Sequence, residues 1–288
     1  MTLPDPLREQ LRLLALELQN DGIKLILGGG YGLVLRTEYI RRTGVPTRFE
    51  QIPEARSTND LDLFLSAEII TSAEKIEKIR DALKKLEFVP LAKFFQFILP
   101  VVFEAMETPI KIDLLAAPPE TEAGRGLVKI SRPRIRPKKA KNIHGYLTEE
   151  AVTLEENLQP IDISETGATP LEIYLPHPFS YLVMKLFALR DRLEDEDKDF
   201  GAYHAFDIYR VVGMMTEKEW KEAVELRNRF RAAPKIIEAG AIAEQLFADL
   251  ESVGVLRVRQ HARATGFSIP PENLAALIED LQELLPGA

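Results

Sequence analysis

Apolar residues in the first 120 positions alternate between helical spacing and short continuous runs. The runs that predict strands are 23–27, 61–65, 94–99 and 110–115. The stretches whose apolar spacing predicts helices are 5–20, 31–42 and 76–86. Two prolines and no clear period over 43–57 predict a loop.

Beyond about Pro176 the pattern becomes helical almost to the end of the chain. Apolar residues share one helix face over 179–189, and again over 274–284. The pattern therefore predicts an α/β domain at about 1–170 and a helical domain at about 171–288.

Composition excludes several classes of protein. The 288 residues carry a net charge of −8, 45% hydrophobic residues and no cysteine. Disulfides, cysteine-ligated zinc and a thiol nucleophile are therefore ruled out. The chain shows no leader of basic then apolar residues and no apolar run of membrane length, so we expect a cytoplasmic protein without a membrane partner. The acidic balance argues against broad coating of nucleic acid, although it says nothing about a local patch.

A glycine run, Gly28-Gly29-Gly30-Tyr31-Gly32, follows the first predicted strand and precedes a predicted helix. Glycines at such a turn let a phosphate approach the backbone, and a helix N-terminus offers free N–H groups to an anion. A purely structural turn explains the same residues, because the run matches neither GxGxxG nor a Walker motif.

Two acidic residues open the strand predicted at 61–65. Asp60 and Asp62 are two apart, so they project to the same side of a strand whose leucines face the other way. Neighbouring carboxylates repel unless a cation lies between them, and Mg²⁺ binds a few carboxylates together with water and phosphate oxygens. The alternative is a turn at Asn59-Asp60 followed by an exposed Asp62.

A third aspartate, Asp113, interrupts the apolar strand predicted at 110–115. A carboxylate there is costly unless it is paired, hydrogen-bonded or bound to metal. If this strand lies beside the one at 61–65, Asp113 completes a cluster of three carboxylates. An edge strand with Asp113 beside Lys111 is the alternative.

Gly-Gly after a strand, Asp-x-Asp opening a strand and a single Asp on a later strand together resemble the nucleotidyltransferase superfamily. Within it the chain resembles the AbiEii-type group, which includes toxins of toxin–antitoxin and phage-defence systems. The segments 185–190 (KLFALR) and 204–209 (HAFDIY) resemble helical motifs of that group. Thirty-one positions separate Gly29 from Asp60, more than compact members have, so 38–55 is expected to be an insertion.

The resemblance implies an α+β fold, a nucleotidyltransferase-like mixed sheet with flanking helices followed by a helical domain. It implies that Asp60, Asp62 and Asp113 bind Mg²⁺ and that Asp113 helps to activate the acceptor hydroxyl. It also implies catalytic roles for Lys185 and Asp207. The implied nucleotide-binding residues are Gly28, Gly29, Arg56, Thr58, Lys185 and Arg190. On sequence alone, a lysine such as Lys185 on an amphipathic helix would extend to solvent.

A local reversal of charge occupies residues 125–141, which contain eight cations and no acid. Binding to phosphate is largely electrostatic, so this stretch predicts contact with an RNA backbone or a nucleotide. The predicted RNA-binding residues are Arg132, Arg134, Arg136, Lys138 and Lys139. Pro133 and Pro137 limit the stretch to an edge strand or a loop. Charge that only keeps an edge strand soluble is the alternative.

The resulting hypothesis is an NTP-dependent nucleotidyltransferase that moves an NMP to a hydroxyl acceptor such as RNA or tRNA, as a toxin with a cognate antitoxin. Two alternatives stay open. One is an inactive protein of this fold that binds a nucleotide or a partner, and the other is an adenylyltransferase for small molecules.

Overall fold

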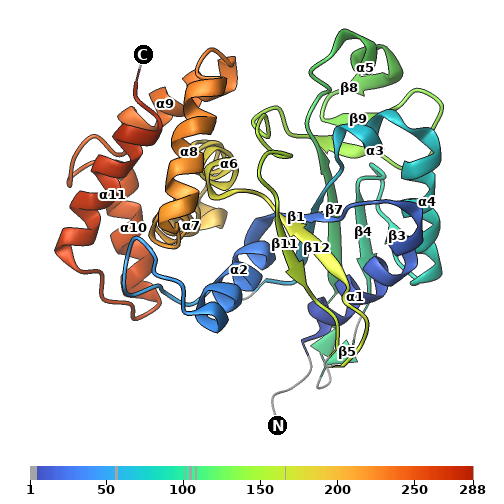
Figure 1. Ribbon diagram of the computed structural model, residues 1–288, viewed down its shortest axis with the longest axis horizontal. Coiled ribbons are helices and arrows are strands. Elements are labelled where there is room, and N and C mark those ends of the chain that lie inside the picture. The colour runs from blue at the N-terminus through green and yellow to red at the C-terminus, as the bar shows by residue number, and fades with distance from the viewer. Residues whose placement is uncertain are drawn as a thin grey trace. The chain divides into compact units, whose positions relative to one another are not determined.

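The computed structural model describes residues 5–55, 58–100, 102–103, 106–107, 109–165 and 167–287. The chain forms two compact units (Figure 1). The sheet unit comprises Met1–Arg36, Ala55–Glu149 and Leu158–Pro176. The helical unit comprises Thr37–Glu54, Glu150–Asn157 and His177–Ala288. The helical unit thus takes in two segments from before residue 170, including most of the expected insertion at 38–55.

The sheet unit contains a strand in each of the four runs expected from the sequence, and several more. Its strands are β1 (Ile26–Leu27), β2 (Asp60–Phe64), β3 (Val89–Pro90), β4 (Gln96–Leu99), β5 (Val102–Phe103), β6 (Met106–Glu107), β7 (Ile110–Ala116), β8 (Val128–Ser131), β9 (Arg134–Pro137), β10 (Gly145–Leu147), β11 (Gln159–Asp162) and β12 (Glu172–Leu175). Its helices are α1 (Pro6–Leu18), α3 (Ala67–Thr71), α4 (Ala73–Lys85), α5 (Glu122–Leu127), a 3₁₀ turn at Gln19–Asp21 and the start of α2 (Gly29–Thr43).

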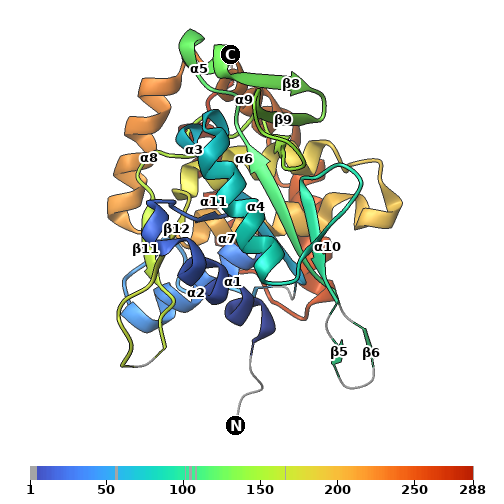
Figure 2. The same cartoon turned by 90° about the vertical axis from the view of Figure 1, so that its right-hand side faces the viewer.

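The main sheet is mixed, with strand order β11-β12-β1-β2-β7-β10-β9-β8, and β4 pairs with both β7 and β3. Strands β2 and β7 run parallel at its centre. Figure 2 shows α1, α3 and α4 lying across one face of this sheet. The predicted fold class, a mixed sheet with flanking helices followed by a helical part, is confirmed.

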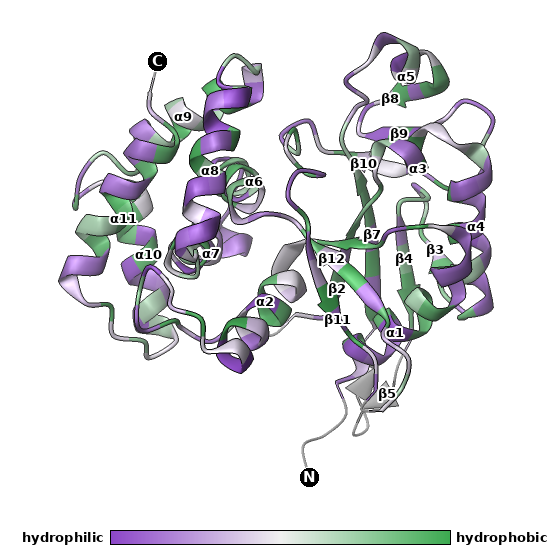
Figure 3. Ribbon diagram, viewed as in Figure 1, coloured by the Kyte–Doolittle hydropathy of each residue, from purple (hydrophilic) through white to green (hydrophobic). Residues whose placement is uncertain are grey.

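Alternating burial explains why the helices cover that face. Leu61, Leu63, Ile112 and Leu114 are fully or almost fully buried and alternate with polar or partly exposed residues on β2 and β7. In α1 the predicted stripe of Leu7, Leu11, Leu14 and Leu18 is buried. Figure 3 shows the central strands coloured largely hydrophobic, beside a more hydrophilic α4. The sheet therefore has one core face and one face that carries polar side chains.

The basic stretch differs from its predicted place at an edge. Strand β9, which holds Arg134 and Arg136, pairs with β10 on one side and β8 on the other, so β8 is the edge strand. Pro137 is the last residue of β9 and Pro133 precedes the strand, so neither removes a donor from its middle.

The helical unit contains α6 (Pro178–Arg190), α7 (Ala202–Gly213), α8 (Glu217–Phe230), α9 (Pro234–Leu246), α10 (Val253–Ala264) and α11 (Pro271–Leu284), with a 3₁₀ turn at Glu196–Gly201. The two predicted apolar faces are buried, over 179–189 in α6 and over 274–284 in α11. These helices pack on one another around α6 and α7.

Candidate active site

The central parallel strands bring the predicted carboxylates together. In their register Asp62 lies directly opposite Asp113, and Asp60 lies opposite Lys111. Residues in register on neighbouring strands project to the same side of a sheet, about 4.8 Å apart. All four side chains therefore project from the face opposite the covering helices.

Among the described residues, one cation, Lys111, lies beside these carboxylates, and two of their oxygens lack a hydrogen bond. Lys111 Nζ lies 3.8 Å from Asp60 Oδ1, and both side chains are about half exposed. Burial raises the pKa of Asp113, a hydrogen bond from Gln96 lowers it, and the nearby charge of Asp60 raises it again. Gln96 pairs with Asp113 across β4 and β7. The Oδ1 atoms of Asp60 and Asp113 are buried and accept no hydrogen bond from the described residues.

The glycine turn lies against Asp62. The N–H of Gly28 donates to the backbone oxygen of Asp62 at 2.8 Å. Gly29 has φ +59°, and a Cβ added there would collide with the Asp62 carboxylate. Because α2 begins at Gly29, the positive end of its dipole lies beside that carboxylate. Glycine is required at this position by both conformation and space.

The remaining predicted residues around the turn are accounted for separately. Thr58 Oγ1 accepts a hydrogen bond of 3.2 Å from the N–H of Asp60, so it shapes the entry to β2. Arg56 lies outside the described residues. The sheet unit thus brings together Gly28, Gly29, Thr58 and the three aspartates.

The carboxylates meet the chemical requirement for Mg²⁺ only in part. In the described part of the chain, no three His, Asp or Glu side chains are gathered as a ready set of metal ligands. Mg²⁺ needs few protein ligands, since water and substrate phosphates complete its octahedral shell. Two buried carboxylate oxygens without a hydrogen-bond donor fit that incomplete set. The residues present would supply part of a Mg²⁺ shell, with water and phosphate oxygens supplying the rest.

Lys185 and Asp207 meet inside the helical unit. Lys185 Nζ lies 2.6 Å from Asp207 Oδ2, with side chains 8% and 2% exposed. Arg210 Nη1 lies 3.3 Å from Asp207 Oδ1, and its Nη2 donates to Thr37 Oγ1 at 2.9 Å. We call Lys185, Asp207 and Arg210 the buried triad. The alternative in which Lys185 extends to solvent is therefore wrong, because the Asp207 charge holds it inside.

Arg190, the other predicted nucleotide-binding residue of α6, has protein partners of its own. Its Nη1 lies 2.5 Å from Glu238 and its Nη2 lies 2.7 Å from Asp191. Its guanidinium also lies 4.7 Å from the Phe187 ring centroid. Contact with a nucleotide would require Arg190 to leave these two acids.

The predicted RNA-binding residues fall into four situations. Arg132 pairs with Glu149 at 2.6 Å. Arg136 Nη1 donates to the backbone oxygens of Pro137, Lys138 and Ala140, which fixes the bend after β9. Lys138 and Lys139 are exposed. The side chain of Arg134 makes no hydrogen bond or ion pair within the part of the chain that the structure describes.

Sheet register places part of the basic stretch on the carboxylate face. Tyr146 of β10 lies opposite both Leu115 of β7 and Arg134 of β9, and Arg136 lies opposite Lys129 of β8. Leu115 is two residues beyond Asp113 and so shares its side of the sheet. Tyr146 is 42% exposed, so an aromatic ring lies between the acids and the cations of one face.

Three residues of these clusters were not predicted from the sequence: Gln96, Tyr146 and Arg210. Gln96 is the one polar residue of an apolar strand, which is a signal of the same kind as Asp113. Arg210 follows Asp207 by three positions, a helical spacing that predicts an ion pair. The position of Tyr146 depends on strand pairing, for which the sequence has no local signal.

Comparison with solved structures finds matching chains, one of which is described as nucleotidyltransferase-like. The crystal structure of an antigenic nucleotidyltransferase-like protein from Paracoccidioides brasiliensis is similar with a TM-score of 0.40 and 14% sequence identity. The similarity covers 81% of this chain and 91% of that chain. No protein-family model and no curated protein matches the sequence. Across the residues described, no helix is both long and apolar enough to cross a membrane.

Proposed function

We propose that the chain is a metal-dependent nucleotidyltransferase that transfers a nucleoside monophosphate from an NTP to a hydroxyl acceptor. One observation carries the proposal: Asp62 and Asp113 lie opposite each other on adjacent parallel strands, beside a glycine turn that only glycine can form. A turn of backbone N–H groups beside paired carboxylates suits a triphosphate and its divalent cation.

Different residues of the site would bind the metal, bind the triphosphate and hold the Asp113 carboxyl. Asp60 and Asp62 would hold Mg²⁺, and the N–H groups at the start of α2 would bind the triphosphate. When bound, Mg²⁺ neutralises phosphate charge and makes the α-phosphorus more electrophilic. Gln96 holds the Asp113 carboxyl by a hydrogen bond while its Oδ1 stays without a donor.

The proposed transfer is a single displacement at the α-phosphorus. The acceptor hydroxyl passes its proton to Asp113, and its oxygen forms a bond to the α-phosphorus. The bond from that phosphorus to the bridging oxygen breaks, and its electron pair leaves with pyrophosphate. Asp113 acts here as the general base, a role that requires it to be within hydrogen-bond reach of the hydroxyl.

The test compares α-³²P-labelled and γ-³²P-labelled NTPs, each with Mg²⁺ and total RNA, in wild type, Asp62→Asn and Asp113→Asn. Asp81→Asn is the matched control, since its carboxylate pairs with Arg80 on α4 of the same unit. We expect α-label on an acceptor, lost at least 100-fold in both site variants and kept in the control. Transfer of γ-label alone would indicate a kinase, and Mg²⁺-dependent binding without transfer would indicate an inactive nucleotide-binding protein.

We further propose that the acceptor is RNA. The support is the shared face of the sheet, where Lys129 and Arg134 lie beyond Tyr146 from the carboxylates. Cations bind the backbone of a single strand, and an exposed aromatic ring stacks on its bases. An acceptor strand along this face would bring its terminal hydroxyl toward Asp113.

Arg134 and Arg136 provide a matched test, because they share a strand, a face and a charge. Arg134→Gln should weaken binding of a fluorescent single-stranded RNA about threefold to tenfold without changing stability. Arg136→Gln should lower stability by about 1–3 kcal/mol, because three backbone oxygens lose their donor, and should leave RNA affinity unchanged. Equal RNA binding by wild type and Arg134→Gln would exclude an RNA strand bound along this face of the sheet. The assay contains no NTP, so it does not depend on transfer.

The proposed toxin role is supported by the resemblance of the motifs alone. Induced expression of the wild type should stop growth of the host, and Asp62→Asn should not. Rescue by a small protein encoded beside the gene would identify a cognate antitoxin. Growth unaffected by an active wild-type enzyme would favour an adenylyltransferase for small molecules.

A further inference from the structure

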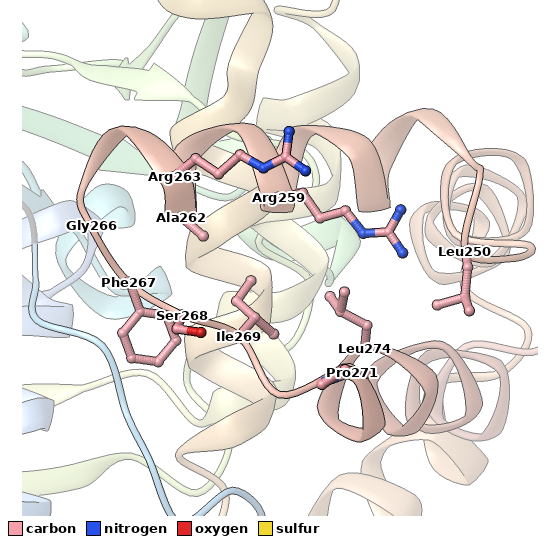
Figure 4. A pocket seen from close by; sticks show the side chains of 10 residues that line it. All are labelled: Leu250, Arg259, Ala262, Arg263, Gly266, Phe267, Ser268, Ile269, Pro271 and Leu274. Carbon is pink, nitrogen blue, oxygen red and sulfur yellow. The ribbon is translucent and has the colours of Figure 1, made fainter.

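The helical unit contains a cavity of about 490 Å³ that the proposed transferase chemistry does not use. It lies between α10, the connection at 265–270 and the start of α11 (Figure 4). Ligand sites in proteins commonly measure about 300–1,000 Å³, so this cavity has room for a small organic molecule.

The charged wall of the cavity comes from Arg259 and Arg263. They are four positions apart on α10, which places them one turn apart on the same helix face. Within the described chain, the only acid that forms an ion pair with either of them is Glu251, 3.8 Å from Arg259 and 83% exposed. No lining residue is acidic. Like charges one turn apart on a helix repel each other, and an anion bound by both guanidinium groups would relieve that repulsion.

The opposite wall is apolar and held in place. Leu274 of α11 is 4% exposed, whereas Leu250 is 41% exposed at the rim. Phe267 packs edge-on against Phe206 and Tyr209 of α7, with ring centroids 6.0 and 6.4 Å apart. Figure 4 shows Arg259 extending from α10 toward Leu250 and Leu274. An apolar body could therefore lie on this floor while its anionic group meets the arginines.

Stabilisation of the helix end explains only part of this arrangement. Arg263 lies in the last turn of α10, where a cation compensates the negative end of the helix dipole. Arg259 lies one turn earlier and lines the cavity wall instead. Both guanidinium groups keep donors available, because each has five N–H groups.

We propose that this cavity binds a small amphipathic organic anion, with a carboxylate, sulfonate or phosphate held by Arg259 and Arg263 and an apolar body against Leu274 and Phe267. The site is independent of the proposed transferase activity, whose carboxylates and glycine turn belong to the sheet unit. Ordinary metabolite acids with an aromatic ring or an alkyl chain have this chemistry.

The test uses the full chain and 8-anilinonaphthalene-1-sulfonate, a fluorescent anion with an apolar body. We expect saturable binding near one molecule per chain, displaced by decanoate but not by inorganic phosphate or MgATP. Arg259→Gln and Arg263→Gln should each weaken binding about tenfold. Arg231→Gln makes the same change in charge at an exposed position of the same unit and should have no effect.

A second variant tests the cavity without changing its charge. Ser268 is exposed and lines the cavity, so Ser268→Trp should fill it and abolish binding while thermal unfolding stays near that of wild type. Binding that survives both arginine substitutions, or that Ser268→Trp leaves intact, would overturn the proposal. Displacement by MgATP would also overturn it, because the probe would then occupy the nucleotide site. Displacement by phosphate alone would overturn it as well, because the ligand would then need no apolar body.

Discussion

Replacing Gly29 by alanine tests the contact between the glycine turn and Asp62. Gly29 has φ +59°, a conformation that costs an alanine about 1–2 kcal/mol. Its new Cβ would also collide with the Asp62 carboxylate. Forcing extra volume into a packed position costs about 1–3 kcal/mol more. The expected loss of unfolding free energy is therefore about 2–5 kcal/mol.

Gly22 is a matched control in the same unit. It has φ +64°, and a Cβ added there meets no atom within 4 Å. Gly22→Ala therefore carries the backbone strain without the collision, and should lose only about 1–2 kcal/mol. The difference between the two variants in urea unfolding measures the contact with Asp62.

Activity separates the two variants further. A shift of about 1 Å in a catalytic group can lower a rate about 100-fold, so folded Gly29→Ala should lose transfer of α-label by that factor. Gly22→Ala should react as the wild type does. In an Asp62→Ala background the extra instability of Gly29→Ala should shrink, since the carboxylate is gone and only the Cβ of residue 62, 2.9 Å from the new Cβ, still crowds it. Equal stability and equal activity of the two alanine variants would refute the reasoning.

Further predictions concern buried charge in the helical unit. Asp207→Asn should lower the free energy of unfolding by about 3–5 kcal/mol, because it leaves the two cations of the buried triad without a counter-charge. Lys185→Met should lower it by less, because the pair of Arg210 with Asp207 remains. Equal urea midpoints of the two variants would contradict this prediction. Burial raises the pKa of Glu150 in the folded protein above its value in the unfolded chain. The folded state is therefore destabilised as pH rises from the unfolded pKa through the folded pKa, where the buried carboxyl loses its proton. Glu150→Gln should therefore stabilise the protein at pH 7 and have little effect near pH 4, in parallel thermal unfolding scans.

Local pattern was sufficient for the helices that have one apolar face. In α1 and α11 the apolar spacing identified the buried leucines, because one helix face fixes both periodicity and burial. The strands β2, β4 and β7 were found as short apolar runs. Their bounds moved by one or two residues, since pairing with neighbours decides where a strand ends.

Strands outside such runs were not predictable from local pattern. The region 144–175 contains β10, β11 and β12, each of three or four residues with polar positions among them. A strand this short is stabilised by its partners, and β10 and β12 pair with strands distant in sequence, β7 and β1. The interior position of β9 depends on β8 and β10, neither of which the local pattern predicts as a strand. Charge alone likewise does not distinguish Arg136, which fixes a bend, from its neighbours.

Register across the sheet changes what the net charge of −8 means for a polyanionic substrate. Counted over the chain, that charge opposes nucleic acid. On the polar face of the sheet, however, Asp60, Asp62 and Asp113 lie on the central strands, and Lys129 and Arg134 lie on β8 and β9. Cations at one end can bind a phosphate backbone while carboxylates at the other end bind a cation, because screening limits each interaction to about 10 Å. The two ends should then fail separately. Substitution of Asp62 should stop transfer and leave RNA binding intact, whereas substitution of Arg134 should weaken RNA binding and leave transfer intact at saturating RNA. If both substitutions removed RNA binding, or both removed transfer at saturating RNA, the cations and the carboxylates would form a single site and this reasoning would be wrong.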